Sequence, residues 1–567
     1  MIERTANLID IEGRRIGPYR IVVEDRRIAA LEPLPGADEA SLPYALPGYV
    51  DAHVHIESSM LVPSEFAKLA VAHGTVATVS DPHEIANVVG VAGVDFMIEN
   101  GRRVPFKFFF GAPSCVPATA FETAGATIDA AAIGELLARD EILYLAEMMN
   151  YPGVLAGDPE VLAKLRHAEA TGKPVDGHAP GIRAAEANAY AAAGITTDHE
   201  CVSIEEAIDK LNAGMKILIR EGSAAKNFDA LFPLIDRFPG RIMFCSDDKH
   251  PDDLLHGHID ELVRRSLAAG ADLFLVLAAA CLTPVRHYGL PVGTLRVGEP
   301  ADFQIIDNLT DFKTLETVID GQPVASQGEP FFASVACQPI NRFECHPKQV
   351  EDFLVSATSP AGERSGIDPA KASDGSPDSV SVRVIEAIDR ALVTGERTVE
   401  LPLRRGHVLT DPARDILKLT VVNRYQDAPP AVAFIHGFGL KLGAIASSVG
   451  HDSHNILAIS GDDESLCRAV NRVIGVRGGI AAIDGSEGHL LPLPIAGLMT
   501  DRPGTDVAAE YQAIERFVKQ RLGCPLTSPF TTLSFMALLV IPSLKLSDLG
   551  LFDCGTFRLL GQANTSG

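Results

Sequence analysis

The sequence has no Cys-X-X-Cys pair, no excess of basic residues and no apolar run long enough to cross a bilayer. Its nine cysteines are dispersed, which is typical of reduced thiols in the cytosol. The formal net charge of −25 argues against nucleic acid and against an anionic membrane surface as partners. The N-terminus lacks the apolar stretch of a signal peptide, and the longest apolar runs, such as Leu273–Leu282 and Phe535–Ile541, predict buried strands or helices. We therefore expect a soluble, cytoplasmic protein.

What the chain does have is the length and composition of a globular protein with several domains. Its 567 residues are too many for one ordinary core and predict two or three domains. Hydrophobic residues make up 46% of the chain and charged residues 22%, which excludes a disordered or fibrous protein.

Changes in sequence pattern along the chain predict the domain boundaries. Residues 1–46 contain short alternating strands and residues 285–345 return to short strands, so we expect the two segments to build one small β domain. Residues 47–284, between them, predict the catalytic domain. Residues 346–379 predict a linker, because much of this segment is rich in Ser, Pro, Gly, Asp and Ala. Residues 380–567 predict a further α/β or α+β domain.

The predicted catalytic domain alternates short β-rich segments with Ala-rich helical stretches such as Pro63–His73, Ile204–Ala213 and Asp252–Ala268. The strand candidates are Tyr49–His55, Thr75–Asp81, Lys107–Ala112, Tyr144–Asn150, Pro174–His178, Thr196–Glu200, Met215–Glu221 and Arg241–Asp247. Eight such units over roughly 240 residues match the usual size of a (β/α)8 TIM-like barrel. A doubly wound parallel sheet would also alternate, so that fold stays open as the alternative.

A His-X-His motif ends the first predicted strand of this domain. Residues two apart on a strand share a face, so His53 and His55 can both point toward one metal ion. The C-terminal ends of barrel strands are also where barrel enzymes hold their active sites. Two incidental histidines are the alternative, because the motif alone is weak evidence.

Further imidazole and carboxylate groups follow other predicted strands. Glu147 lies in an otherwise apolar fourth strand, where a carboxylate is costly to bury unless it is paired or bound to metal. His178, His199 and Asp247 follow the fifth, sixth and eighth strands. Singly, each could be a satisfied core residue, an ion-pair partner or, for the carboxylate pair Asp247 and Asp248, a helix cap. Together with the His-X-His motif, they predict a metal centre at one mouth of the barrel.

The number and type of these groups predict the metal. Imidazole and carboxylate ligands suit zinc, manganese or iron, and they require no thiolate. Six ligands are too many for one open catalytic ion. We therefore expect two divalent ions that share a bridging carboxylate.

Long segments throughout the barrel carry a family resemblance. They are HIESSM at 55–60, DPHEIANVVG at 81–90, FFFGAPSCVPAT at 108–119, AEMMNYPGV at 146–154, DGHAPG at 176–181, TTDHE at 196–200, MKILIREGSAAKN at 215–227 and FCSDDKHPDDLLHGHID at 244–260. With PGYVDAHVHIESS and EPADFQIID, they make the chain resemble the amidohydrolase superfamily and, within it, the adenine deaminase family. The tail beyond Val380 resembles that family's C-terminal domain.

The resemblance implies hydrolytic deamination of adenine to hypoxanthine and ammonia at a binuclear centre. The implied metal ligands are His53, His55, Glu147, His178, His199 and Asp247. Many binuclear members of the superfamily bridge their metals with a carboxylated lysine on the fourth strand. Glu147 takes that place here, so the resemblance makes Glu147 the bridging anion. We expect two manganese ions, with iron or zinc as alternatives.

Catalytic roles follow from the position of each group near the predicted metals. We expect Asp247 to take the proton of the attacking hydroxide and His83 or Glu84, after the second strand, to protonate the purine ring. The candidates for substrate binding are Asp81, Ser58, Ser59, Arg220, Glu221 and Ser223. Loop and helix capping is the alternative role for the Asp-Pro-His-Glu segment and for the two serines.

Two other polar clusters carry less weight. His256 and His258 repeat the His-X-His pattern, but on a predicted helix residues two apart point to nearly opposite sides. His451, Asp452 and His454 could bind a metal or complete the site from the tail, although surface or capping roles are the favoured interpretation.

Other functions use the same ligands. A cyclic amide hydrolase of the dihydroorotase or hydantoinase kind is the first alternative, and the glutamate bridge and the Asp-Pro-His-Glu segment favour the deaminase over it. A deaminase of another aminopurine and a scaffold without catalysis are further alternatives. We expect a small-molecule purine as substrate, a homodimer as the assembly, and neither nucleic acid nor a membrane as partner.

Overall fold

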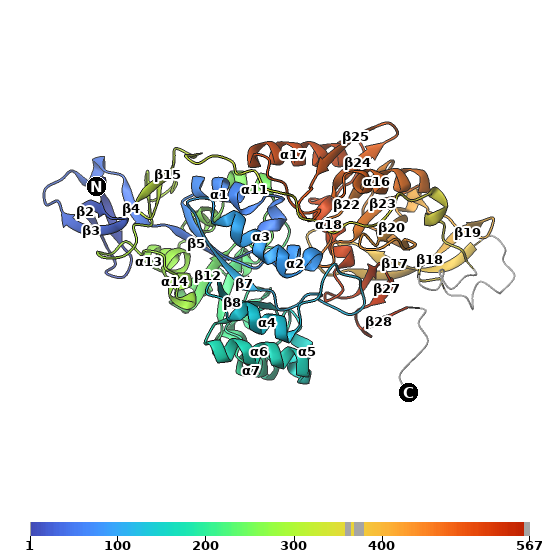
Figure 1. Ribbon diagram of the computed structural model, residues 1–567, viewed down its shortest axis with the longest axis horizontal. Coiled ribbons are helices and arrows are strands. Elements are labelled where there is room, and N and C mark those ends of the chain that lie inside the picture. The colour runs from blue at the N-terminus through green and yellow to red at the C-terminus, as the bar shows by residue number, and fades with distance from the viewer. Residues whose placement is uncertain (1, 358–364, 368–378, 561–567) are drawn as a thin grey trace.

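The computed structural model describes residues 2–357, 365–367 and 379–560. The molecule is elongated, with an N-terminal sheet at one end, a barrel in the middle and a C-terminal sheet domain at the other end (Figure 1). Of the predicted linker, residues 346–379, positions 358–364 and 368–378 lie outside the described residues. The domain boundaries expected from the sequence stay predictions.

One eight-stranded sheet joins segments from both sides of the barrel. Its strands are β1 (Ile2–Asp10), β2 (Arg15–Glu24), β3 (Arg27–Pro33), β4 (Tyr44–Pro47), β13 (Phe303–Ile306), β14 (Thr314–Ile319), β15 (Gln322–Ser326) and β16 (Glu329–Pro330). The order β16-β15-β14-β13-β4-β1-β2-β3 places β4 between β13 and β1. Because β4 leads directly into the barrel, this sheet anchors both ends of the barrel segment.

The barrel strands lie where the sequence predicts them. They are β5 (Tyr49–Val54), β6 (Thr75–Ser80), β7 (Lys107–Ala112), β8 (Ile142–Met148), β9 (Val175–Gly177), β10 (Thr197–Asp198), β11 (Lys216–Arg220) and β12 (Ile242–Cys245). All paired neighbours run parallel. The Thr196 amide donates to the Val175 carbonyl at 2.9 Å, and the Asp247 amide donates to the His53 carbonyl at 3.0 Å. These bonds link β9 to β10 and β12 to β5, which confirms the TIM-like barrel over an open sheet.

Helices surround the barrel strands. They are α1 (Pro63–Ala72), α2 (His83–Val89), α3 (Val91–Gly101), α4 (Ala130–Leu137), α5 (Tyr151–Ala156), α6 (Pro159–Thr171), α7 (Ala184–Ala192), α8 (Ile204–Asn212), α9 (Phe228–Leu231), α10 (Leu234–Arg237), α11 (Pro251–His256), α12 (Ile259–Ala268), α13 (Leu273–Leu277) and α14 (Thr283–Tyr288). None of the helices in the described part of the chain combines the length and the apolar character needed to cross a membrane.

The helix predicted over Asp252–Ala268 is wrong as a single element. The chain leaves α11 at Gly257 and starts α12 anew, where the His258 amide donates to the Asp260 carboxylate at 2.6 Å. Glycine has low helix propensity, and the aspartate provides a new helix start. His258 is fully buried and its Nε2 atom lies 2.8 Å from Asp51 Oδ2, so it supports β5 from behind.

The C-terminal domain is built on a nine-stranded sheet. Its strands are β17 (Ser379–Glu386), β18 (Gly395–Arg404), β19 (His407–Val408), β20 (Leu417–Val422), β21 (Ala431–His436), β22 (Ala444–Ser447), β23 (Ile456–Ser460), β24 (Gly479–Asp484) and β25 (Glu487–Pro492), in the order β19-β18-β17-β21-β20-β23-β22-β24-β25. A second small sheet contains β26 (Leu544–Ser547), β27 (Gly550–Asp553) and β28 (Arg558–Leu559). Helix α16 (Asp463–Gly475) packs on the large sheet, and α17 (Gly504–Gln520) and α18 (Pro529–Ser534) follow it.

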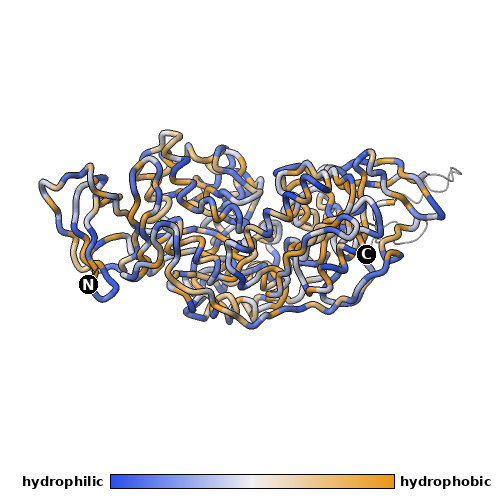
Figure 2. The backbone as a smooth tube through the Cα atoms, turned by 90° about the horizontal axis from the view of Figure 1, so that it is seen from above, coloured by the Kyte–Doolittle hydropathy of each residue, from blue (hydrophilic) through white to orange (hydrophobic). Residues whose placement is uncertain are grey.

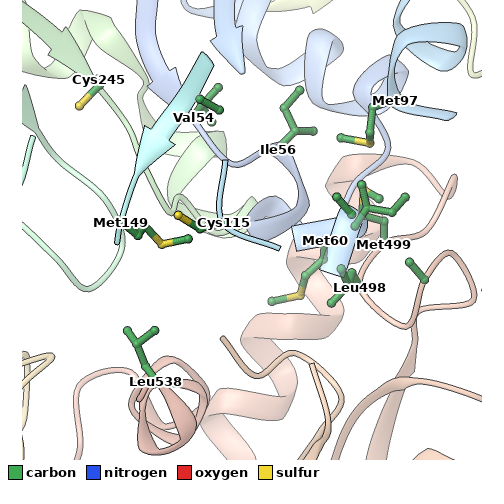
Figure 3. Close-up of a cluster of buried hydrophobic side chains, with 14 of the residues drawn as sticks. Val54, Ile56, Met60, Met97, Cys115, Met149, Cys245, Leu498, Met499 and Leu538 are labelled. Atoms are coloured by element: carbon green, nitrogen blue, oxygen red, sulfur yellow. The ribbon is translucent and has the colours of Figure 1, made fainter. Parts of the chain in front are cut away.

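A continuous apolar core joins the barrel to the C-terminal domain. Met60 lies beside Leu498 and Met499, and Leu538 lies opposite Met149 of the barrel (Figure 3). The Thr500 amide donates to the Met60 carbonyl at 2.9 Å, which ties the two chain segments through their backbones. Hydrophobic and hydrophilic stretches alternate along the chain throughout the molecule (Figure 2). The C-terminal domain therefore packs directly on the barrel.

Candidate metal centre

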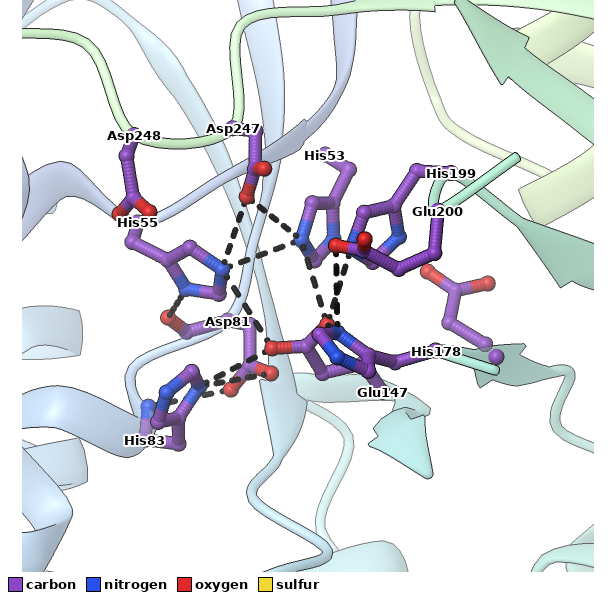
Figure 4. A network of polar contacts seen from close by, with 12 residues as sticks. His53, His55, Asp81, His83, Glu147, His178, His199, Glu200, Asp247 and Asp248 are labelled. Atoms are coloured by element: carbon purple, nitrogen blue, oxygen red, sulfur yellow. Dashed lines mark hydrogen bonds and ion pairs between the residues drawn. The ribbon is translucent and has the colours of Figure 1, made fainter. Parts of the chain in front are cut away.

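Glu147, near the end of β8, lies at the centre of a cluster of histidines (Figure 4). Its Oε2 atom is 3.0 Å from His178 Nδ1, 3.1 Å from His199 Nε2 and 3.8 Å from His53 Nε2. Its Oε1 atom is 3.5 Å from His55 Nε2. Both oxygens of one buried carboxylate thus face imidazole nitrogens from three other strands.

Asp247 approaches the same histidines from the end of β12. Its Oδ1 atom lies 3.2 Å from His55 Nε2 and 3.6 Å from His53 Nε2. The two Nε2 atoms of the His-X-His motif are 3.1 Å apart, as two side chains on one strand face require. Asp248 instead accepts a hydrogen bond from Ser58 Oγ, so its carboxylate lies outside this cluster.

The donor set fits a divalent metal. His53, His55, Glu147, His199 and Asp247 are all buried, and their ligand atoms fall into several groups in which each atom lies within 4.8 Å of the others. His178 Nε2 is buried and has no hydrogen-bond partner in the described structure. Neutral imidazoles and carboxylates that converge without a thiolate suit manganese, iron or zinc. The chemistry of the cluster is therefore that of a metal centre.

Charge pairing keeps the two central carboxyl groups ionised. Burial by itself raises the pKa of Glu147, but His178 and His199 lower it well below its ordinary range. Burial likewise raises the pKa of Asp247, and Arg220, His53 and His55 lower it well below its ordinary range. Both groups are therefore carboxylates, the form that binds a cation.

The loop after β6 brings a second layer of polar groups to Glu147. His83 Nδ1 lies 3.2 Å from Asp81 Oδ2 and 3.5 Å from Glu147 Oε1. Asp81 also accepts a hydrogen bond from the His83 amide at 3.0 Å, so it caps the start of α2 as well as holding the imidazole. Its backbone carbonyl lies 3.2 Å from His55 Nδ1. The structure thus brings Asp81 and His83 together with the predicted ligands.

Arg220 is part of the site, and both of its Nη atoms pair with carboxylates, whereas its buried Nε has no hydrogen-bond partner in the described structure. Its Nη1 atom lies 2.7 Å from Asp247 Oδ2 and also pairs with Glu200 Oε1, while its Nη2 atom lies 3.0 Å from Glu200 Oε2. Glu200 also lies 3.6 Å from His178 Nδ1 and 3.5 Å from His199 Nε2. Glu200 is not among the site residues predicted from the sequence. Its only signal is an acidic residue directly after a predicted ligand.

The remaining substrate-binding candidates have other partners. Glu221 pairs with Lys226 at 2.9 Å and with Arg265 at 2.8 Å. Ser223 Oγ accepts a hydrogen bond from the His250 amide at 2.8 Å, and Ser59 Oγ donates to the Ile56 carbonyl at 2.6 Å. Neither Ser58 nor Ser59 caps α1, because that helix has no side-chain cap.

Residues of the C-terminal domain, including His451 and Asp452, line the cavity that contains the cluster around Glu147. His451 Nδ1 and His454 Nε2 each pair with one oxygen of Glu84, and Asp452 Oδ1 lies 3.9 Å from His83 Nε2. A surface role for these three residues is wrong, because all are buried. His454 is 370 residues from Glu84 along the chain, so no local pattern could have indicated this contact.

Charge pairing also sets the protonation of the Glu84 group. Burial raises the pKa of Glu84, but His451, His454 and His83 together lower it well below its ordinary range. Burial lowers the pKa of His451, yet Glu84 and Asp248 raise it to about 9. Glu84 is therefore a carboxylate next to a protonated imidazole.

Comparison with known proteins identifies the family. Residues 44–324 match the amidohydrolase family, and residues 391–558 match the adenine deaminase C-terminal domain. The chain is 55% identical to an adenine deaminase of Salinibacter ruber, over 98% of this chain and 97% of that protein. It is 53% identical to one of Sulfurovum sp. over 99% of both chains, and 49% identical to one of Methanosarcina barkeri over 98% of both chains. The chain therefore belongs to the adenine deaminase family.

Proposed function

We propose that this protein catalyses the hydrolytic deamination of adenine to hypoxanthine and ammonia. The observation that carries the proposal is the convergence of Glu147 and Asp247 with four histidines at the mouth of the barrel. The likeness to adenine deaminases over nearly the whole chain favours adenine over cyclic amides as the substrate.

The family and the buried cluster support divalent metal binding. The proposal assigns two ions, held by His53, His55, Glu147, His178, His199 and Asp247, with Glu147 shared between them. Manganese is the proposed ion, with iron or zinc as alternatives, because the donor set suits all three. When bound, a divalent ion supplies hydroxide near neutral pH, because it lowers the pKa of water.

Asp247 is the proposed base for the proton of the attacking nucleophile. Its Oδ2 atom is occupied by Arg220, so only its Oδ1 atom faces His53 and His55. This arrangement supports Asp247 as the base that takes the proton. Arg220 then acts as a positioning residue, since its guanidinium is already paired with two carboxylates.

Attack at C6 puts electron density on the purine ring, so a group in the site must protonate N1. His83 and Glu84 are the proposed pair, and their pairing favours a division of roles. Glu84 accepts from His451 and His454 and is a carboxylate, so it holds charge and orientation rather than donating a proton. His83 lies 3.6 Å from Glu84 and 3.5 Å from Glu147, which supports its imidazole as the proton donor.

The contacts of the predicted substrate-binding residues favour supporting roles for most of them. Asp81 positions His83, and Ser58 positions Asp248 at the cavity wall. Ser59 and Ser223 hydrogen-bond to neighbouring backbone groups, and Glu221 Oε1 pairs with Lys226 and Arg265, so these residues support the surrounding loops. A homodimer stays a prediction.

The test follows adenine by ultraviolet absorbance and ammonia release, using protein expressed with manganese. We expect conversion to hypoxanthine by the wild type and by His167→Gln, a control in an exposed histidine on α6. Glu147→Gln should remove activity together with bound metal. A wild-type protein that binds two metals per chain but does not convert adenine would contradict the proposal.

A further inference from the structure

The C-terminal domain supplies one wall of the cavity that holds the metal-centre residues. Its contribution consists of the apolar side chains Leu392, Phe535, Leu538 and Ile541 and the polar side chains His451 and Asp452. The barrel supplies the ligands on the other side, including Glu147 and His199. Any substrate in this cavity therefore touches both domains.

Asp452 is the carboxylate of this wall that lacks a full set of partners. It is 4% exposed, and its Oδ2 atom has no hydrogen-bond partner in the described structure. Its Oδ1 atom lies 3.9 Å from His83 Nε2, beyond hydrogen-bond distance. A buried carboxylate oxygen without a donor is costly, so a donor supplied by a ligand would stabilise it.

The other carboxylates that line the cavity are already paired. Glu84 pairs with two imidazoles, and Asp248 accepts from Ser58. Glu200 and Asp247 share the Arg220 guanidinium. Asp452 Oδ2 is thus an acceptor of this cavity without a hydrogen bond in the described structure, and Glu84 Oε1, which also lacks one, lies against His451 Nδ1.

Adenine has only one N–H donor that can reach such an acceptor. Its N–H donors are the 6-amino group and the single N–H of the imidazole ring. The amino group leaves during the reaction, so it must lie at the metal ligands. His83 contacts Glu147 through Nδ1 and approaches Asp452 through Nε2, so the two carboxylates lie on opposite sides of one imidazole ring, and a bicyclic purine lying beside that ring would span a similar distance.

We propose that Asp452 accepts the imidazole N–H of the purine and so selects the free base over forms substituted at that nitrogen. This inference rests on the proposed function. A nucleoside or an N-alkylated adenine lacks the donor and also adds bulk beside the carboxylate. A site built around one polar contact discriminates sharply against an analogue that lacks it.

The apolar part of the same wall is held in a form suited to a flat ring. The Phe535 ring stacks on His451 with centroids 5.5 Å apart and an angle of 26° between the rings. Lys545 donates to the Leu392 carbonyl at 2.7 Å and to the Phe535 carbonyl at 2.9 Å. Lys545 is therefore a positioning residue for two side chains that flank the proposed purine.

The test compares wild type with Asp452→Ala, the isosteric Asp452→Asn and Asp506→Asn, a control in an exposed aspartate of α17. The substrates are adenine, 7-methyladenine and 9-methyladenine. For Asp452→Ala we expect a rise of about 10- to 100-fold in KM for adenine with kcat nearly unchanged, because a lost hydrogen bond to a charged group affects bound substrate and transition state alike. The preference for adenine over the methylated bases should fall by a similar factor, and the control should match the wild type.

The outcomes separate this inference from the proposed function. If the wild type does not convert adenine, the proposed function fails and this assignment fails with it. If the wild type converts adenine but both Asp452 variants keep its KM and its preference for the free base, the assignment alone is overturned. Loss of bound metal in the folded Asp452→Asn variant would also overturn it, since Asp452 would then support the metals rather than the purine. Melting curves establish that each variant is folded.

Discussion

Nη1 of Arg220 lies 2.7 Å from Oδ2 of Asp247, and the same guanidinium pairs with both oxygens of Glu200. All three side chains are buried. A residue expected to read the edge of the purine is thus held between two carboxylates. Removal of a partner from a buried ion pair leaves an uncompensated charge and costs about 3–5 kcal/mol.

Arg220→Met should therefore lower both the Tm and kcat, because it leaves two buried carboxylates without a cation. We expect kcat for adenine to fall by about 10- to 100-fold, the scale measured for groups that orient catalytic residues. Arg220→Lys should recover part of the Tm, since it restores the charge without the bidentate geometry. A variant with a raised KM and an unchanged Tm would instead indicate that Arg220 contacts the substrate.

Metal removal should abolish activity reversibly. A chelator should reduce adenine turnover to background, and added Mn2+ should restore it as bound metal approaches two ions per chain. His199→Gln should bind less metal and lose more than about 100-fold in kcat/KM, because its Nε2 faces the Glu147 carboxylate. Metal analysis and activity are measured on the same samples, with His167→Gln as control. Full activity in metal-free protein would contradict the metal centre.

Glu84→Gln should lower kcat by about 10- to 100-fold, the range for groups that orient other site residues, with bound metal unchanged. The amide keeps the shape of the side chain but removes the charge that faces His451 and His454. His454→Asn should lower kcat less, because His451 still pairs with Glu84. Loss of metal from Glu84→Gln would show instead that Glu84 is a ligand.

Lys545 predicts a pH dependence of stability. Burial lowers the pKa of this lysine from its ordinary value of 10.5 to about 7. The lysine of an unfolded chain stays protonated up to about pH 10.5, whereas the folded chain loses that proton above about pH 7. The cost of burying the ammonium therefore lowers the stability of the folded chain most below pH 7, and this cost decreases as the pH rises. The Tm of the wild type relative to Lys545→Met should therefore increase between pH 7 and pH 9.5. A difference in Tm that does not change with pH would contradict the prediction.

The periodicity of the chain was enough to predict the barrel and its ligands. A strand places residues two apart on one face, so His53 and His55 had to point the same way once β5 formed. The C-terminal ends of parallel barrel strands meet at one mouth, so Glu147, His178 and His199 had to converge if the barrel closed. Both predictions depend only on the geometry of a strand and on the rule that the C-terminal ends of barrel strands share one mouth, so the sequence alone could indicate them.

The break between α11 and α12 is a feature that the local sequence pattern did not predict. The apolar and polar pattern of Asp252–Ala268 is helical throughout, but the chain turns at Gly257 so that His258 can pair with Asp51 behind β5. A tertiary contact with a buried carboxylate outweighed the local preference for a continuous helix.

The sequence by itself thus indicated the barrel, the family and the proposed ligands, because each prediction depends on short-range periodicity and on motifs within single segments. The family resemblance implied Asp247 as a ligand, and the tertiary structure shows it facing the histidines while Asp248 accepts from Ser58. Only the tertiary structure decided that Arg220 is held by Glu200, that His454 pairs with Glu84 and that Asp452 lines the cavity. The physical reason is that these contacts join side chains whose separation along the chain carries no periodic signal. They depend on how the C-terminal domain packs on the barrel, and that packing is set by an apolar core built from both domains.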